Sequence, residues 1–175
     1  MLLQRLSYIL ISALTFIGCS SNQPLETVDS VDLQRYQGTW YEIASFPQRF
    51  QKGCHCTSAT YTATQEDFVV VENRCRKDSI NGEESYIKGK AYIVKNSNNA
   101  KLEVEFFWPF KGDYWIIDLD KDYQYAVVGH PNREYLWILS RKPQMSDSLY
   151  TEITKRIADK GFDLSILQKT VQIAP

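Results

Sequence analysis

Apolar and polar residues alternate over several short stretches of the chain. In the clearest stretch, Leu102, Val104 and Phe106 alternate with charged residues at positions 101, 103 and 105. An alternation of this period predicts a β-strand with one apolar and one polar face. Seven further stretches, rich in β-branched and aromatic residues, stand between short polar turns. The strands predicted in this way cover residues 40–46, 57–64, 68–75, 86–95, 101–108, 114–119, 123–129 and 135–140.

The short turns between these strands favour an antiparallel meander. An open sheet of this size exposes the hydrogen-bonding groups of its edge strands, whereas a closed barrel has no edge. The interior of an eight-stranded barrel has room for one small ligand. We therefore predict an all-β fold, an eight-stranded up-and-down antiparallel barrel.

The apolar pattern changes to a helical period after the eighth predicted strand. Leu149, Ile153 and Ile157 form an i, i+4, i+8 stripe, Ser146 can cap the N-terminus of the helix, and Gly161 can end it. This pattern predicts one C-terminal α-helix that packs on the outside of the barrel. A short strand over residues 170–173 is expected to extend the sheet.

The first residues of the chain have a different composition from the rest. Arg5 precedes an apolar run from Leu6 to Ile17, which is shorter than the roughly 20 residues of a membrane-spanning helix. Such a run followed by small residues is typical of an export signal. Cys19 directly follows Gly18, which favours a lipoprotein signal that is removed before Cys19 over an ordinary cleaved signal.

Cleavage before Cys19 divides the chain into three parts. Residues 1–18 are predicted to be the signal peptide, residues 19–30 the acylated cysteine with a flexible tether, and residues 31–175 the folded domain. Lipid chains on Cys19 would bind a membrane by burying methylene groups, at about 0.8 kcal/mol each. Serine rather than aspartate follows Cys19, and by resemblance to bacterial sorting signals this implies the outer membrane, on its periplasmic face.

The sequence offers little for catalysis or for nucleic-acid binding. The 175-residue chain has a net charge of −1, and it contains neither a glycine-rich phosphate loop nor a G-x-S-x-G motif. Glu42 is expected inside the barrel, where a buried carboxyl can act as a general acid, but a hydrogen-bonded structural role is the stronger interpretation. We therefore predict a protein that is not an enzyme, needs no cofactor and does not bind nucleic acid.

Three cysteines lie in the predicted domain, at positions 54, 56 and 75. An exported chain meets an oxidising compartment, so one disulfide is expected, with one thiol left over. Strand alternation leaves open whether Cys54 or Cys56 pairs with Cys75. A zinc site built from these cysteines and His55 is disfavoured because the Cys-x-Cys spacing suits a structural site poorly, and no metal is predicted.

Three short motifs, in the right order, resemble those of the lipocalin family. Gly38-x-Trp40-Tyr41 opens the first strand, DLDKDYQYAVV spans residues 118–128, and Arg141 directly follows the eighth strand. The stretch YLWILSRKP, residues 135–143, is similar to bacterial outer-membrane lipocalins. The resemblance covers roughly residues 31–172, and it implies a barrel that binds a small hydrophobic ligand.

The resemblance also implies roles for particular residues. Gly38, Trp40 and Arg141 would close the barrel floor, with the Arg141 guanidinium over the Trp40 ring. By the same likeness, the KGC stretch favours a bond between Cys54 and Cys75.

The other end of the barrel should be its mouth. Aromatic side chains there can form a ligand gate or a membrane contact, or they can fold back over the barrel, and rim cations can hold a phosphate or carboxylate headgroup. The predicted rim residues are Phe46, Arg49, Arg76, Trp108, Phe110 and Lys111.

An apolar inner face with a few polar tips suits an acyl chain. The predicted pocket residues are Glu42, Ala44, Tyr61, Val71, Ala91, Leu102, Val104, Phe106, Tyr114, Tyr135, Trp137 and Leu139. Small residues on this face, such as Gly89, favour an open cavity over a filled barrel.

These expectations combine into one functional hypothesis. The protein is predicted to be a lipid-anchored lipoprotein of the bacterial envelope that binds fatty acids or lysophospholipids for storage, transport or membrane maintenance. The alternatives are an interaction protein with a filled barrel and, less favoured, an enzyme that uses Glu42 or the spare cysteine. A homodimer through the rim aromatics is left open.

Overall fold

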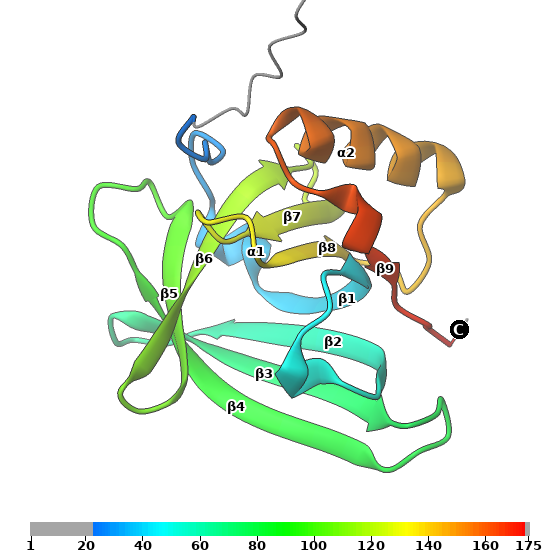
Figure 1. Cartoon of the computed structure of the whole chain (residues 1–175). Helices are drawn as coiled ribbons and strands as arrows, with labels where there is room; N and C mark the ends of the chain where they lie inside the picture. The colour runs from blue at the N-terminus through cyan, green and yellow to red at the C-terminus, as the bar shows by residue number, and fades with distance from the viewer. Residues whose placement is uncertain (1–22, 174–175) are drawn as a thin grey trace, which may run out of the picture.

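A closed barrel forms the body of the protein (Figure 1). The structure is a computed structural model that describes residues 23–173, so the predicted signal peptide and Cys19 lie outside the described residues. Each strand pairs antiparallel with the next, and the first strand pairs with both the second and the eighth, which confirms the predicted barrel. The strands are β1 (Gly38–Ser45), β2 (Cys54–Ala63), β3 (Phe68–Lys77), β4 (Glu84–Ile93), β5 (Lys101–Phe107), β6 (Phe110–Leu119), β7 (Tyr125–Gly129) and β8 (Leu136–Ser140).

The predicted helix is α2 (Asp147–Asp159), which lies across the outer face of β7 and β8 (Figure 1). Ser146 caps it by accepting a hydrogen bond from the backbone N–H of Leu149. Ile153 and Ile157 are buried in a cluster with residues of β7 and β8. Among the described residues, no helix is long and apolar enough to cross a membrane.

The C-terminal segment completes the wall of the barrel. β1 pairs with β2 only over Gly38–Tyr41, and farther along it pairs with the short strand β9 (Gln168–Lys169). Beyond β9, the backbone N–H of Thr170 donates to Ile43, and that of Cys56 in β2 donates to Val171. The segment therefore fills the gap where β1 and β2 separate. The expected strand at 170–173 is present two residues earlier, at 168–169, after the 3-10 helix η2 (Leu164–Ile166).

Besides η2, two further short helices were not predicted from the sequence. The first, α1 (Leu33–Tyr36), begins after Asp32, whose side chain accepts from two backbone N–H groups, and it buries Tyr36 below the barrel. The second, η1 (Arg49–Gln51), lies in the connection between β1 and β2. Each is too short to produce a helical period in the sequence.

The segment before α1 packs against the barrel, in contrast to the flexible tether predicted for residues 19–30. Leu25 is buried in the cluster under α2. The backbone N–H of Val28 donates to the carbonyl of Ile116, and the Arg133 guanidinium donates to the carbonyl of Gln23. Contacts with the folded domain are therefore already made by Gln23, Leu25 and Val28, ahead of residue 31.

A β-bulge in β1 changes which side chains face inward. Glu42 is opposite Leu139, but Ala44 is opposite Ile138, so β1 contains one extra residue at Ile43. Leu139 belongs to the inner cluster and Ile138 to the cluster under α2. Ala44 therefore faces the helix, and its predicted place in the pocket is wrong, because simple alternation does not survive a bulge.

The hairpin between β5 and β6 is tighter than the sequence suggested. The strands predicted at 101–108 and 114–119 left residues 109–113 as their connection, but Phe107 pairs with Phe110, and Trp108 and Pro109 form the tip. Residues 111–113 thus belong to β6, where they continue the pairing with β5.

Candidate ligand-binding site

The floor of the barrel is closed around Trp40, which has no solvent-accessible surface. The Arg141 guanidinium lies 3.8 Å from the centroid of the Trp40 ring. It also donates to the backbone carbonyls of Thr39, Arg35 and Tyr123. Gly38 has φ +88°, and a side chain there would approach the Arg141 guanidinium to 3.4 Å. The position of the Arg141 guanidinium over the Trp40 ring is the contact that the lipocalin resemblance implied.

Three tyrosines fill the space next to Trp40. The Tyr114 hydroxyl lies 2.9 Å from the Tyr36 hydroxyl and 2.8 Å from the Tyr61 hydroxyl. Burial raises the pKa of Tyr61 to about 12 and raises the pKa values of Tyr36 and Tyr114 well above the usual range. All three side chains are therefore neutral phenols at physiological pH. Tyr36 comes from α1, so it was missed with that helix, although the Asp32 cap could have revealed both.

The inner face above this cluster is apolar. Most of the predicted pocket residues pack in a single inner cluster, namely Tyr61, Val71, Ala91, Leu102, Val104, Phe106, Tyr114, Trp137 and Leu139. Tyr135 stacks on Trp137 with ring centroids 6.2 Å apart. Val104, Phe106, Tyr114 and Trp137 remain partly exposed although they belong to the inner cluster. Side chains do not fill the inner face completely.

Phe106 occupies the space that Gly89 was expected to leave open. A side chain at Gly89 would meet the Phe106 ring at 2.6 Å. The β4–β5 pairing covers only Lys90–Ile93 of β4, and a groove of about 400 Å³ opens where these strands separate. Gly89 thus indicates close packing rather than free volume.

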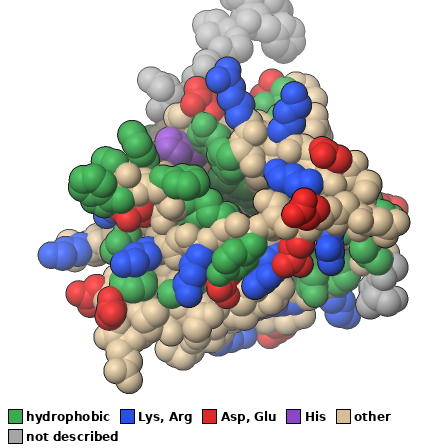
Figure 2. All heavy atoms as spheres, turned by 90° about the horizontal axis from the view of Figure 1, so that it is seen from below, with side chains coloured by type: hydrophobic (Ala, Val, Ile, Leu, Met, Phe, Trp, Pro, Cys, Tyr) green, Lys and Arg blue, Asp and Glu red, His purple; other side chains and the backbone are tan. Residues whose placement is uncertain are grey.

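Large apolar side chains are exposed at the tip of the β5–β6 hairpin. Phe107, Trp108 and Phe110 are 68%, 84% and 76% exposed, and Phe50 of η1 is 67% exposed. Figure 2 shows hydrophobic side chains gathered to one side of a hollow, with acidic and basic side chains mixed on the same face. The hairpin aromatics do not fold back over the barrel.

The rim residues differ in what their side chains contact. Arg49 is exposed on η1. Arg76 lies 3.9 Å from the Glu84 carboxylate. Lys111 lies 3.3 Å from Glu103 and 4.1 Å from the Tyr92 ring centroid, on the polar outer face of β5. Its predicted place at the opening is wrong, because β6 begins before it.

Phe46 is a second correction at the rim. Its side chain is buried against Phe162, with ring centroids 6.1 Å apart, in the cluster under α2. The backbone N–H of Phe46 donates to Leu136, so the chain still follows β8 at this point. The bulge in β1 and this pairing turn Phe46 toward the helix.

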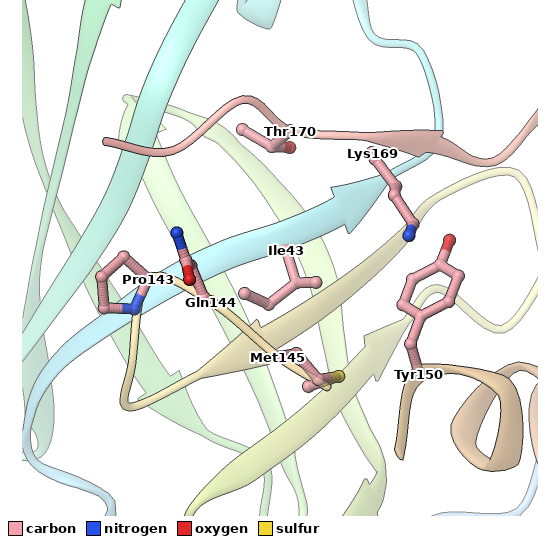
Figure 3. Close-up of a pocket in the computed structure, with 7 residues that line it drawn as sticks. All are labelled: Ile43, Pro143, Gln144, Met145, Tyr150, Lys169 and Thr170. Atoms are coloured by element: carbon pink, nitrogen blue, oxygen red, sulfur yellow. The ribbon is translucent and has the colours of Figure 1, made fainter. Parts of the chain in front are cut away.

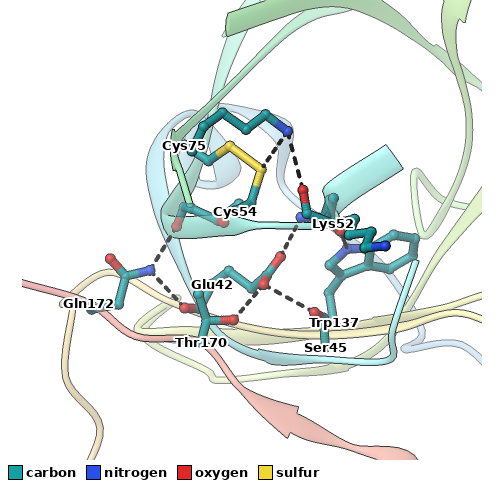
Figure 4. Close-up of a disulfide and its surroundings, with 11 residues drawn as sticks. Glu42, Ser45, Lys52, Cys54, Cys75, Trp137, Thr170 and Gln172 are labelled. Carbon is teal, nitrogen blue, oxygen red and sulfur yellow. Dashed lines mark hydrogen bonds between the residues drawn. A yellow bond between two sulfur atoms is a disulfide. The ribbon is translucent and has the colours of Figure 1, made fainter. Parts of the chain in front are cut away.

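Glu42 is held in a network near the mouth (Figure 4). Its carboxylate accepts hydrogen bonds from Ser45, Thr170 and the amide nitrogen of Gln51, the last at 2.8 Å. The Gln51 amide oxygen accepts from the indole N–H of Trp137 at 3.2 Å. The carboxylate thus connects η1 and the C-terminal segment to the inner face. No sequence pattern indicates the roles of Gln51 and Thr170, because Trp137 is remote from Gln51 and Glu42 is remote from Thr170 along the chain.

A disulfide joins Cys54 and Cys75 and leaves Cys56 free (Figure 4). It connects the first residue of β2 to β3 at the mouth. Because two of the three sulfur atoms are bonded to each other, the zinc site considered from the sequence is not formed. Among the described residues, no group of acidic, histidine or cysteine side chains is arranged to hold a metal.

A second hollow, of about 210 Å³, lies outside the barrel beside α2 (Figure 3). It is lined by Ile43, Pro143, Gln144, Met145, Tyr150, Lys169 and Thr170. Lys169 lies 4.5 Å from the Tyr150 ring centroid at its edge. This hollow is separate from the inner face described above.

The fold and the inner face define a barrel of the class that encloses small molecules: closed at one end, lined by apolar side chains and partly open to solvent. Comparison with known proteins identifies the family. The family model described as a lipocalin-like domain matches residues 31–172, and the chain belongs to the lipocalin family.

Relatives of this chain occur in plants and bacteria. The temperature-induced lipocalin-1 of Arabidopsis thaliana is 41% identical over 162 residues, covering 87% of this chain and 86% of the relative. The outer membrane lipoprotein Blc of Escherichia coli (strain K12) is 40% identical over 157 residues, covering 88% of both chains. The structure of insecticyanin from Manduca sexta superposes with a TM-score of 0.67 at 22% identity, covering 83% of both chains, and supports the fold alone.

Proposed function

We propose that the protein is a lipid-binding lipoprotein that takes up fatty acids or lysophospholipids in its barrel. One observation carries this proposal: the inner face is apolar and partly exposed above a floor closed by Trp40 and Arg141. A molecule with one apolar chain and one polar head matches a pocket that is closed at one end. The exposed aromatic hairpin tip suits contact with the membrane that supplies the lipid.

Burial of the acyl chain alone supplies enough free energy for binding, without any specific polar contact. Burying about 250–350 Å² of acyl chain at about 25 cal/mol per Å² gives about 6–9 kcal/mol before the costs of association. Micromolar binding corresponds to about 8 kcal/mol, so shape and apolar area account for useful affinity.

A structural role rather than catalysis fits Glu42. Its carboxylate accepts hydrogen bonds from three side chains, those of Ser45, Gln51 and Thr170. Its position between η1 and the C-terminal segment suits a structural role.

The amount of lipid that can be extracted from the purified protein tests the proposal. Val104 and Glu103 are neighbours on β5, but Val104 packs with the inner cluster and Glu103 bonds Lys111 outside. We expect wild type and Glu103→Trp to yield extractable lipid, and Val104→Trp, which fills the barrel, to yield much less. Equal yields from all three, or none from wild type, would favour the filled-barrel alternative.

We also propose that Cys19 is acylated and holds the protein at the periplasmic face of the outer membrane. The signal that precedes Cys19 and the name of the Escherichia coli relative, an outer membrane lipoprotein, support this placement. Cys19→Ser should move the protein from the membrane fraction to the soluble fraction, whereas Cys56→Ser should not. Retention of Cys19→Ser in the membrane fraction would contradict lipid anchoring.

A further inference from the structure

The hydroxyls of the tyrosine cluster on the barrel floor carry one proton more than the number of hydrogen bonds between them. The Tyr36, Tyr61 and Tyr114 hydroxyls carry three protons and make two hydrogen bonds, both through Tyr114. No other hydrogen-bonding atom among the described residues reaches these hydroxyls. Every arrangement of the two bonds therefore leaves one proton without an acceptor. Each hydroxyl has a partner within the cluster, but one of the three protons is not donated, so the cluster can still donate one hydrogen bond to a group from outside the chain.

Residue exposure favours Tyr114 as the side chain that offers the proton. Tyr36 and Tyr61 are 2% and 4% exposed, whereas Tyr114 is partly exposed within the inner cluster. When Tyr36 and Tyr61 both donate to Tyr114, the Tyr114 proton is the free one. The free donor then belongs to the side chain that solvent, or a ligand, reaches.

The chemistry of the cluster restricts the partner to a neutral group. Burial is the largest cause of the raised pKa values of all three tyrosines, which shows that this end of the barrel disfavours negative charge. A carboxylate placed here would meet the same penalty. A ketone or hydroxyl oxygen can accept the proton without carrying charge.

We propose that the floor of the barrel is a binding site for a neutral oxygen at the far end of an apolar chain, which accepts the hydroxyl proton of Tyr114. The inference rests on the proposed function, because it places the chain in the barrel with its polar head at the mouth. It narrows the ligand class to chains with an oxo or hydroxyl group at the terminus that enters first. An acyl chain without this oxygen would leave the Tyr114 hydroxyl proton without an acceptor, or would compete with water for the space beside Tyr114.

The test compares fatty acids of equal length with and without a ketone oxygen on the carbon next to the terminal methyl group, titrated into the delipidated protein over a series of chain lengths. We expect the oxo acid to bind about tenfold more tightly at the length that reaches Tyr114, the size of one net hydrogen bond. Equal affinities at every length would overturn the site and leave the proposed function intact. Failure of both acids to bind would overturn both.

Matched variants locate the donor. Tyr114→Phe should abolish the preference for the oxo acid, because the two hydroxyls that it frees belong to Tyr36 and Tyr61, which are buried away from the ligand. Tyr61→Phe should retain it, because the remaining pair, Tyr36 and Tyr114, still makes one bond and keeps one free proton. Loss of the preference in Tyr61→Phe with retention in Tyr114→Phe would overturn the assignment to Tyr114.

A spectroscopic measurement does not depend on affinity or on the stability of a variant. The carbonyl stretch of an isotope-labelled oxo acid bound to wild type should lie at lower frequency than in an apolar solvent, as for a hydrogen-bonded ketone. A bound ligand whose carbonyl absorbs as it does in the apolar solvent would overturn the site.

Discussion

The guanidinium of Arg141 lies over the ring of Trp40, 3.8 Å from its centroid, at the closed end of the barrel. The same group donates to carbonyls of Arg35 in α1, Thr39 in β1 and Tyr123 before β7. One side chain thus joins the adjoining elements α1 and β1 to the chain around β7 and β8, which is remote from them in the sequence. The Arg141–Trp40 pair closes this end of the barrel. The cation–π interaction between the guanidinium and the indole ring contributes about 0.5–2 kcal/mol.

Replacing Arg141 with lysine should destabilise the fold even though the positive charge is kept. A lysine ammonium cannot reproduce the planar fork that reaches three carbonyls, so some of them would lose their donors. We expect the free energy of unfolding in urea to fall by about 1–3 kcal/mol. Lys142→Ala, at the exposed next position, should change it by less than about 0.5 kcal/mol. Equal stability of the two variants would contradict the role of the fork.

The tyrosine cluster predicts a loss of stability at high pH. Below about pH 10, its hydroxyls keep their protons in both the folded and the unfolded chain, so their contribution is fully present. Above that pH the unfolded chain releases protons that the folded protein retains, and the free energy of unfolding falls. For Tyr61, with a pKa of about 12, this contribution is lost as the pH rises from about 10 to 12, a change of roughly 3 kcal/mol.

Urea unfolding of the wild type and Tyr61→Phe over this pH range checks the prediction. Phenylalanine has no proton to release, so the stability of the variant should fall less steeply with pH. Both proteins should carry Cys56→Ser, because a free thiol attacks disulfides at high pH. The same slope in both proteins would show that Tyr61 ionises as readily in the folded protein as in the unfolded chain.

Removing the disulfide should weaken the mouth of the barrel. The Cys54–Cys75 bond spans 21 positions, and closing a loop of this size stabilises a fold by about 3 kcal/mol in the chain-entropy description. Cys75→Ser should lower the free energy of unfolding by about that amount, while Cys56→Ser should have little effect. Alkylation of the unreduced domain from Ser20 onward should label one thiol, at Cys56. Labelling of Cys54 or Cys75 in the folded wild type would contradict the pairing.

Glu42→Gln should loosen the mouth without affecting the floor. The carboxylate accepts from Ser45, Gln51 and Thr170, and an amide would replace one acceptor oxygen by a donor. We expect a loss of about 1–3 kcal/mol in the free energy of unfolding and faster proteolysis in the connection that contains η1. Glu66→Gln, on an exposed turn, is the matched control. Unchanged proteolysis of Glu42→Gln would contradict the role of the network.

The sequence predicted the parts of the fold that depend on regular alternation. Leu102, Val104 and Trp137 face the inner cluster because β5 and β8 keep their period there. The helix was recognised because its apolar stripe and its Ser146 cap agree. The floor was recognised because its motifs are short, specific and ordered along the chain.

The errors have local physical causes that a pattern of apolar residues does not record. Ala44 and Phe46 were placed wrongly because one extra residue in β1 reverses the alternation. Lys111 was placed wrongly because the hairpin turns at Trp108 and Pro109, before the polar residues that suggested a turn. The network around Glu42 could not be predicted, because Gln51 and Thr170 meet it only after the barrel closes.

Titration of the delipidated domain with a lysophospholipid and with the fatty acid of the same chain tests the central claim most directly. The indole of Trp137 belongs to the inner cluster and remains partly exposed, so its fluorescence should change when the chain enters. We predict saturable micromolar binding of both lipids, which is lost in Val104→Trp and kept in Glu103→Trp. Tighter binding of the lysophospholipid would indicate that the rim recognises a phosphate. Absence of a saturable response to either lipid would contradict the lipid-binding function.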